Sequence, residues 1–448
     1  MIPEFTDGFF NVKNGFLPIA EPLQRLPPTY ENVQLLIDSL SDDLLFIEED
    51  RLIGKLSKLE NLKSVIMGET DIMTIAALYR AYCFLASGYL LYPSYCNFVR
   101  TGKYGVARER LPINISEPLI YLAERLDVFP WLEYSYGYSL GNYVRKDKAQ
   151  GLSVDNLKMA CHFSGTPDET GFIMAHVDIN EHTPALLKWS DLLLENMFYN
   201  KDPKEALSMI IDTLKNMNAS RRKMWSVSRP EHYNDFRVFI MGIQGNKDIF
   251  PNGVIYEPES EPRYYRGQSG SQDTIIPFLD TLFRVCDYYP KNRLTEYLMD
   301  MRNYRPKPFR DLLIWLEDNT IGLIEWLLER GCASELIQIY REIYKFRNGH
   351  WQFVQKYIMS NTAYPVATGG TPITTWLPNQ IFATLQAMRY ALDYGTKHHE
   401  EDPSLWLEYE REFNHCIQLL KEQESLLGTD YTPECVYSLN HKYGQSDQ

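Results

Sequence analysis

One histidine in this sequence has the surroundings of a side chain that does chemistry. His350 belongs to a run of apolar residues spaced three or four positions apart, which places them on one helix face: Leu336, Ile339, Ile343, Phe346, Val354 and Tyr357. The imidazole is therefore expected on the buried side, where it needs a polar partner. It is either a core histidine bonded to a carbonyl group or an axial ligand of haem iron. The helical pattern alone leaves both open.

A second candidate is Arg237, which stands among Phe236, Val238 and Phe239. A planar guanidinium can hold a carboxylate through two parallel hydrogen bonds, and the alternative role is a structural salt bridge. Two glycine-containing segments, 265–272 and 367–371, interrupt the helical pattern and are predicted as loops. Loops on a helical scaffold often carry ligand contacts. No GK[ST] follows the second segment, which excludes a phosphate-binding loop.

The elements that must position these residues are predicted to be helices, because few segments alternate with the period of two that a strand needs. The predicted helices lie at 33–56, 72–91, 116–126, 131–144, 203–224, 232–243, 274–286, 293–301, 309–315, 321–330, 334–358, 375–394 and 405–426. We therefore predict an all-α fold. A polar stretch at 146–153 divides a small N-terminal domain (1–150) from a large domain (151–400), and 401–448 form a C-terminal extension.

Composition excludes several classes of protein. A formal net charge of -14 argues against binding to nucleic acid or to an anionic membrane surface. The most apolar segment, 72–92, is interrupted by Arg80 and is predicted to be a buried helix, not a membrane span. The N-terminus lacks the pattern of a secretory signal. Seven cysteines without a CxxC pair indicate reduced thiols, and we expect a cytoplasmic monomer.

Five blocks in one order resemble the indoleamine 2,3-dioxygenase family. Residues 347–358, with an Arg three positions before the His and Val-x-Lys-Tyr-Ile after it, resemble the family's proximal-histidine helix. The other blocks resemble its substrate-arginine helix, a short block before the pocket loop, the loop over the haem and the Thr-Gly-Gly-Thr loop; they are 236–242, 253–257, 267–272 and 367–371. The resemblance covers roughly residues 110 to 390 and fades on both sides.

The resemblance implies a haem b enzyme that adds both atoms of O2 across the indole C2=C3 bond of L-tryptophan, or of a close indoleamine, to give N-formylkynurenine. His350 would be the iron ligand, and an electron donor would keep the iron ferrous. Arg347 and Asp280 match an ion pair behind the haem; the alternative is two solvated surface charges. Arg237 matches the residue that binds the substrate carboxylate.

Further residues of the site follow from the same resemblance. Thr368 matches a hydroxyl near the substrate amine, or it is only part of a Gly-rich turn. Ser269 and Gly270 match the loop over the distal side of the haem, where Ser269 would face O2 or be an ordinary loop serine. Phe172 and Tyr134 match aromatic residues of the substrate pocket.

The sequence departs from the vertebrate members at three places. His176 stands where they have a serine, and related tryptophan 2,3-dioxygenases carry a distal histidine that can bond the indole N–H or O2; otherwise it is only a helix residue. His232 and Tyr233 replace two phenylalanines of the indole slot, so they accept an altered indole or face away. The segment from His350 to Thr368 is shorter, which predicts a less mobile loop.

Two other hypotheses stay open. One is a haem enzyme of the same fold that monooxygenates or rearranges a modified tryptophan, which His232 and Tyr233 favour. The other is a non-enzymatic O2-binding haem protein. Arg237 and Thr368 argue against the second of these, because an oxygen store needs no residues that anchor an amino acid.

Overall fold

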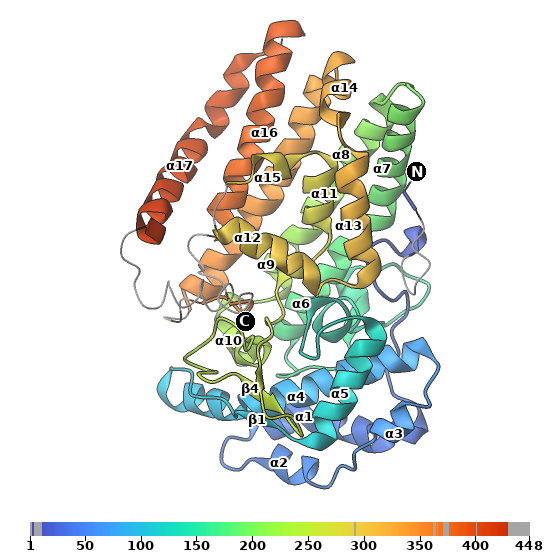
Figure 1. Ribbon diagram of the computed structural model, residues 1–448, viewed down its shortest axis with the longest axis vertical. Helices are drawn as coiled ribbons and strands as arrows, with labels where there is room; N and C mark the ends of the chain where they lie inside the picture. The colour runs from blue at the N-terminus through green and yellow to red at the C-terminus, as the bar shows by residue number, and fades with distance from the viewer. Residues whose placement is uncertain are drawn as a thin grey trace.

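The computed structural model describes residues 2–3, 11–290, 293–361, 364, 366–370, 376–399 and 401–428, and these are mostly helical, as predicted. Figure 1 shows two groups of helices. One group forms the lower half: α1 (Glu31–Leu45), α2 (Arg51–Leu56), α3 (Lys63–Ile66), α4 (Ile72–Thr101) and α5 (Ile113–Leu126). The other group forms the upper half: α7 (Thr183–Phe198), α8 (Lys204–Arg222), α11 (Ile275–Leu282), α13 (Lys307–Asn319), α14 (Leu323–Glu329), α15 (Ala333–Phe353), α16 (Trp376–His398) and α17 (Leu407–Gly428).

Short elements join the two groups. Four helices lie between them: α6 (Pro167–Asn180), α9 (Met224–Val227), α10 (Asn234–Arg237) and α12 (Arg293–Asp300). The described part of the chain also has short strands. β1 (Arg110–Leu111) runs parallel and β5 (Pro262–Arg263) antiparallel to β4 (Val254–Tyr256). The strands β2 (Tyr143–Arg145) and β3 (Leu157–Met159) form a separate antiparallel pair.

The helix α4 forms the centre of the lower group. It is the one helix among the described residues that is long and apolar enough to cross a membrane, but 94% of its most apolar stretch is buried inside the protein. Its N-terminus is capped by Asp71, whose carboxylate accepts from the backbone N–H groups of Met73 and Thr74. It packs against α1 and α5, so it is a core helix, as the sequence predicted.

Two hydrophobic cores meet at α6 and α15. Ile173 of α6 belongs to the lower core, whereas Ile179 of the same helix belongs to the upper core. In α15, Ile343 lies in the upper core and Phe353 in the lower core. Residues on both sides of position 150 contribute to the lower core, and the division of the chain at that position stays a prediction.

The start of α6 is fixed by its own sequence. The hydroxyl of Thr166 accepts from the backbone N–H of Glu169, Pro167 occupies the first turn, and the Glu169 carboxylate accepts from the backbone N–H of Ser164. Thr166 thus caps the helix, and Glu169 holds the chain that precedes the cap, although it does not bond the Thr166 N–H as in a full capping box. It fixes the position of the helix that carries Phe172 and His176.

The helix predicted at 33–56 is divided into α1 and α2, and two other predicted helices were wrong. The segment 131–144 forms only one π-helical turn at Tyr134–Tyr138 followed by β2. The Glu133 carboxylate holds the backbone N–H groups of this turn, and a Cβ on Gly141 would lie 2.7 Å from the Tyr136 carbonyl oxygen, so the chain bends back on itself here. The segment 232–243 is broken into 3-10 turns around the four-residue α10. The helix α7 was missed.

Candidate functional site

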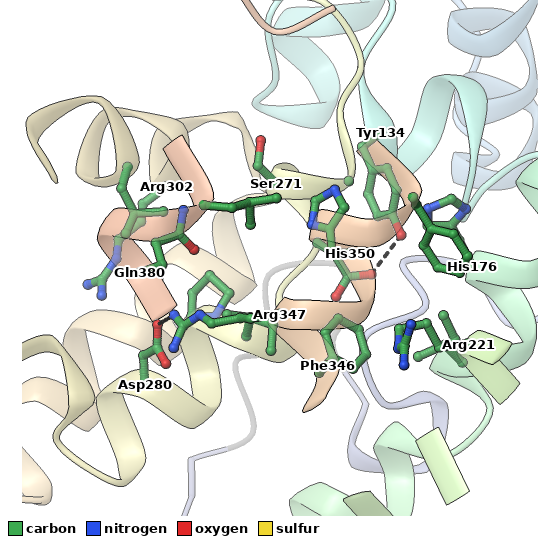
Figure 2. Close-up of a pocket in the computed structure, with 18 of the residues that line it drawn as sticks. Tyr134, His176, Arg221, Ser271, Asp280, Arg302, Phe346, Arg347, His350 and Gln380 are labelled. Carbon is green, nitrogen blue, oxygen red and sulfur yellow. Dashed lines mark hydrogen bonds and ion pairs between the residues drawn. The ribbon is translucent and has the colours of Figure 1, made fainter. Parts of the chain in front are cut away.

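A cavity with two adjoining parts lies where the two cores meet. The two parts hold about 930 and about 890 Å³ of space between atoms, including space that is open to solvent. Both parts share the residues His176, Met224, Gly270, Ser271, His350, Phe353 and Leu377. Figure 2 shows His350 near the middle of the first part, with His176 and Arg221 on one side and the pair of Arg347 and Asp280 on the other.

His350 has the properties that a metal-binding histidine needs. Neither ring nitrogen has a hydrogen-bond partner among the described residues, and His350 lines both parts of the cavity. Burial, with the neighbouring His176 and Arg221, lowers the pKa of His350 to about 4. The imidazole is therefore neutral at pH 7 and keeps a free lone pair. The core alternative, a histidine bonded to a carbonyl group, does not describe it.

His176 is held in one tautomer. Its Nδ1 lies 3.0 Å from the carbonyl oxygen of Phe172, and because a carbonyl only accepts, Nδ1 carries the proton. Nε2 is then an acceptor, and a Cβ on Gly270 would lie 3.7 Å from it. Burial lowers the pKa of His176, so the ring stays neutral. It therefore presents an unprotonated nitrogen at the wall of the cavity.

Aromatic rings enclose His176. The rings of Phe172 and Tyr134 lie 5.5 and 5.7 Å from the imidazole, and Tyr233 lies 5.0 Å from Phe172. The Tyr134 hydroxyl donates to Asp273 at 2.7 Å. Phe172 and Tyr233 line the second part of the cavity and Tyr134 the first. The structure thus brings these three predicted pocket residues together around one flat, mainly apolar space.

Glycines hold the two predicted loops against each other. A Cβ on Gly242 would overlap the backbone of Gly267, and a Cβ on Gly267 would overlap the Thr368 carbonyl. The backbone N–H of Gly242 also donates to that carbonyl at 2.9 Å. This close backbone packing puts Ser269 and Thr368 on the lining of the second part. The hydroxyl groups of Ser269 and Ser271 are 2.9 Å apart.

Arg347 and Asp280 form a buried ion pair. Their side chains are 2% and 1% exposed, so the alternative of two solvated charges is wrong. Arg347 also donates to the hydroxyl of Thr384, and Asp280 accepts from the hydroxyl of Tyr289. The pair joins α15 to α11 beside His350 and closes that end of the cavity.

Two predicted substrate residues do not line the cavity. Arg237 is fully buried, and its guanidinium donates to the Tyr104 hydroxyl at 3.0 Å and to the Val366 carbonyl at 2.9 Å. It lies next to Tyr233, which does line the cavity, so it stands one layer behind the wall. His232 is partly exposed and bonded to Asp235 at 3.0 Å. Their roles stay predictions.

The sequence analysis missed Arg221, whose side chain lines the first part of the cavity. It lies at the end of α8 beside the exposed Arg222. Basic residues in the last turn of a helix are common because they favour the helix dipole, so the pair gave no sign of a site. The residue that makes room for Arg221 is Gly349, one position before His350, because it has no side chain. Nothing in the sequence links these two positions.

Fold and cavity together define a mostly helical protein that presents one neutral, partnerless histidine to a large apolar cavity between two cores. The chain belongs to the indoleamine 2,3-dioxygenase family, whose model matches residues 8–375. It is 24% identical to indoleamine 2,3-dioxygenase 1 of Rattus norvegicus, over 76% of this chain and 81% of that protein. It is also similar to a 6-hydroxytryptophan 2,3-dioxygenase of Fusarium equiseti, at 26% identity over 78% and 83%, and to the indoleamine 2,3-dioxygenase of Saccharomyces cerevisiae, at 25% over 77% and 78%. The chain is therefore an oxidoreductase of the dioxygenase type that acts on tryptophan or an indoleamine.

Proposed function

We propose that this chain binds haem b through His350 and inserts both atoms of O2 across the indole C2=C3 bond of L-tryptophan or a close indole, giving N-formylkynurenine. The observation that carries the proposal is the neutral imidazole of His350, which has no partner in the described part of the chain and faces a cavity of about 930 Å³. His350 would be the one protein ligand of the iron. Bound ferrous haem would supply the site where O2 binds.

The residues of the cavity fit such a group. No cluster of three His, Cys, Asp or Glu side chains exists among the described residues, so a bare metal ion has no cage here, whereas haem iron needs one axial ligand. The lining beside His350 includes Phe353, Met224 and Leu377, which suit a flat apolar ring. Buried Arg347, paired with Asp280, fixes the helix that carries His350.

The remaining residues would bind and orient the substrate. Nε2 of His176 is an acceptor on the cavity wall, which matches the N–H group of an indole. Phe172 and Tyr233 supply a slot for the ring. The hydroxyls of Thr368 and Ser269 lie on the same wall, where they can accept from a substrate ammonium group or donate to a bound oxygen. Arg237 would reach the carboxylate after release from Tyr104.

A substituted indole is the alternative substrate, and Tyr233 favours it. Its ring lines the slot and its hydroxyl lies beside the buried guanidinium of Arg237, so the two together give the slot a polar end that a hydroxylated indole could bond. One relative is named a 6-hydroxytryptophan 2,3-dioxygenase, which agrees with this alternative. Monooxygenation or rearrangement of such a tryptophan is the second candidate reaction. A cytoplasmic location, a monomeric state and an external electron donor stay predictions.

Turnover of two substrates tests the proposal. Haem-loaded, reduced protein is mixed with O2 and either L-tryptophan or 6-hydroxy-L-tryptophan, and products are identified by absorbance and mass. We expect a formylkynurenine from at least one substrate. His350→Ala should lose the haem, and Arg237→Ala should raise KM. Full haem retention in His350→Ala, or an unchanged KM in Arg237→Ala, would reject the role of that residue.

A further inference from the structure

Arg221 is a buried cation for which the described chain supplies no opposite charge. Its side chain belongs to a residue only 7% exposed, and it takes part in no ion pair within the described ranges. Its one hydrogen bond runs from Nε to Oδ1 of Asn218, at 3.4 Å. The two terminal nitrogens have no bonded partner there, although Arg221 lines the cavity beside His350. A buried charge without a partner is costly, so an occupant of the cavity is the natural source of one.

The carboxylates near Arg221 all form hydrogen bonds or ion pairs with other residues. The Glu342 carboxylate accepts a hydrogen bond from the Asn218 amide at 3.0 Å and pairs with the Lys345 ammonium group at 2.6 Å. Asp273 accepts from the Tyr134 hydroxyl at 2.7 Å and from the Asn180 amide at 2.8 Å.

The third carboxylate, Asp280, is paired with Arg347. Burial, and to a smaller extent Arg222, lowers the pKa of Arg221 to about 10, so its side chain is still charged at neutral pH. Each carboxylate of the cavity region thus has its own donors, and the charge of Arg221 is not balanced by any of them.

The position of the guanidinium is set by Gly349. A Cβ on Gly349 would coincide with the terminal atoms of Arg221, so the guanidinium occupies the space that any other residue would fill. The rings of Phe353 and Phe346 lie 5.5 and 5.9 Å from the guanidinium carbon and hold it from the sides. The head of Arg221 is therefore fixed against α15, one residue away from the proposed iron ligand.

We propose that Arg221 binds a carboxylate of the molecule that occupies the cavity. The inference rests on the proposed function, which supplies two sources of this group: a propionate of haem and the α-carboxylate of the amino-acid substrate. A guanidinium can hold either through two parallel hydrogen bonds. Arg347 and Arg302 also line the first part of the cavity, but they are paired with Asp280 and Glu317. Among the described lining residues, Arg221 is therefore the arginine without a carboxylate partner.

Haem binding to the apoprotein tests the first source. Haem and haem dimethyl ester, which lacks both carboxylates, are titrated into wild type, Arg221→Met, Gly349→Ala and Arg222→Met. Arg222 is exposed and adjacent, so its variant controls for lost charge. A charge-assisted hydrogen bond predicts that wild type prefers haem over the ester by roughly 10- to 100-fold. Arg221→Met should abolish this preference, and Arg222→Met should keep it.

Gly349→Ala is the second variant, because it displaces the guanidinium without removing the charge or enlarging the core. Gly349→Ala should reduce the preference of the apoprotein for haem over haem dimethyl ester. Binding of L-tryptophan and of tryptamine to haem-loaded protein, followed by the change in the haem spectrum, tests the second source. If the substrate carboxylate is the partner, Arg221→Met loses the preference for L-tryptophan and keeps the preference for haem.

Unchanged preferences in both titrations, in a folded Arg221→Met protein, would overturn the proposal. That result would leave the proposed function intact wherever wild type binds haem and makes a formylkynurenine. A wild type that binds no haem would instead reject the proposed function, and the inference with it.

Discussion

The proton on His176 decides what the cavity can recognise. Because Nδ1 donates to the carbonyl of Phe172, Nε2 is left to accept. A serine at this position would be a shorter group that both donates and accepts. The chain thus carries a fixed acceptor on the wall, at the place where the resemblance put a distal histidine.

Replacing His176 should therefore weaken the binding of substrates that carry an indole N–H. His176→Leu is expected to weaken L-tryptophan binding about 2- to 10-fold, the value of one neutral hydrogen bond. 1-Methyl-L-tryptophan, which lacks that proton, should bind the variant and wild type alike. Both affinities are read from spectral titrations of haem-loaded protein. An equal loss for the two ligands would show that His176 acts by shape alone.

Residue types and order predicted much of the site, and the tertiary packing decided the rest. His350 lines the cavity, and its place on the apolar face of a helix was visible in the sequence. His176, Phe172, Tyr134 and Tyr233 line it too, but only the family resemblance pointed to them. The resemblance also named Ser269, Gly270, Thr368, Arg347 and Asp280, which line the cavity as well. The position of Arg237 behind the wall depends on Tyr104, which is distant in the chain. Arg221 could not be found because its neighbour Gly349 lies on another helix.

At the scale of elements, the Arg347–Asp280 pair fastens α15 to α11. Arg347→Met would leave the Asp280 carboxylate buried without its cation, which predicts a loss of roughly 3–5 kcal/mol in the free energy of unfolding. The double variant Arg347→Met with Asp280→Leu should recover most of that loss, because no charge is left unpaired. Urea unfolding of the apoproteins measures both. A double variant as unstable as the sum of the single variants would contradict the account.

The turn at Tyr134–Tyr138 predicts a dependence of stability on pH. Glu133 caps this turn, and burial raises the pKa of its carboxyl group to about 7. The folded protein then keeps a proton that the unfolded chain releases near 4.5, so stability falls as the pH rises through this range. Relative to Glu133→Gln, wild type should lose about 3 kcal/mol between pH 4.5 and 7.

Unfolding of both proteins across this pH range checks the sign. A difference that does not change with pH, or that favours wild type at high pH, would mean that the backbone N–H groups of Ser135, Tyr136 and Gly137 keep Glu133 ionised.

The same turn shows why sequence periodicity predicted a helix at 131–144 that the structure does not have. Side chains spaced as in a helix are also compatible with a buried turn, and only the contacts of Glu133 and Gly141 distinguish them.

At the scale of the whole molecule, the cavity exists because two cores share two helices. α6 and α15 each begin in one core and end in the other, and His176 and His350 lie where each helix passes between the cores. α17 packs against α16 through the stacked rings of Phe382 and Phe413, 5.3 Å apart, so the described part of the extension belongs to the folded body (Figure 1). The all-α class was predictable from periodicity. The meeting of the cores was not, because it depends on contacts between distant segments.

The most direct test of the account is the fate of labelled oxygen. Reduced, haem-loaded protein is mixed with L-tryptophan or 6-hydroxy-L-tryptophan under ¹⁸O₂. The mass of the product is measured by mass spectrometry before its carbonyl oxygens exchange with water. The account predicts a formylkynurenine that carries both labelled atoms. A product with a single labelled atom would indicate monooxygenation, and haem-loaded protein that leaves both substrates unchanged would contradict the proposed dioxygenase activity.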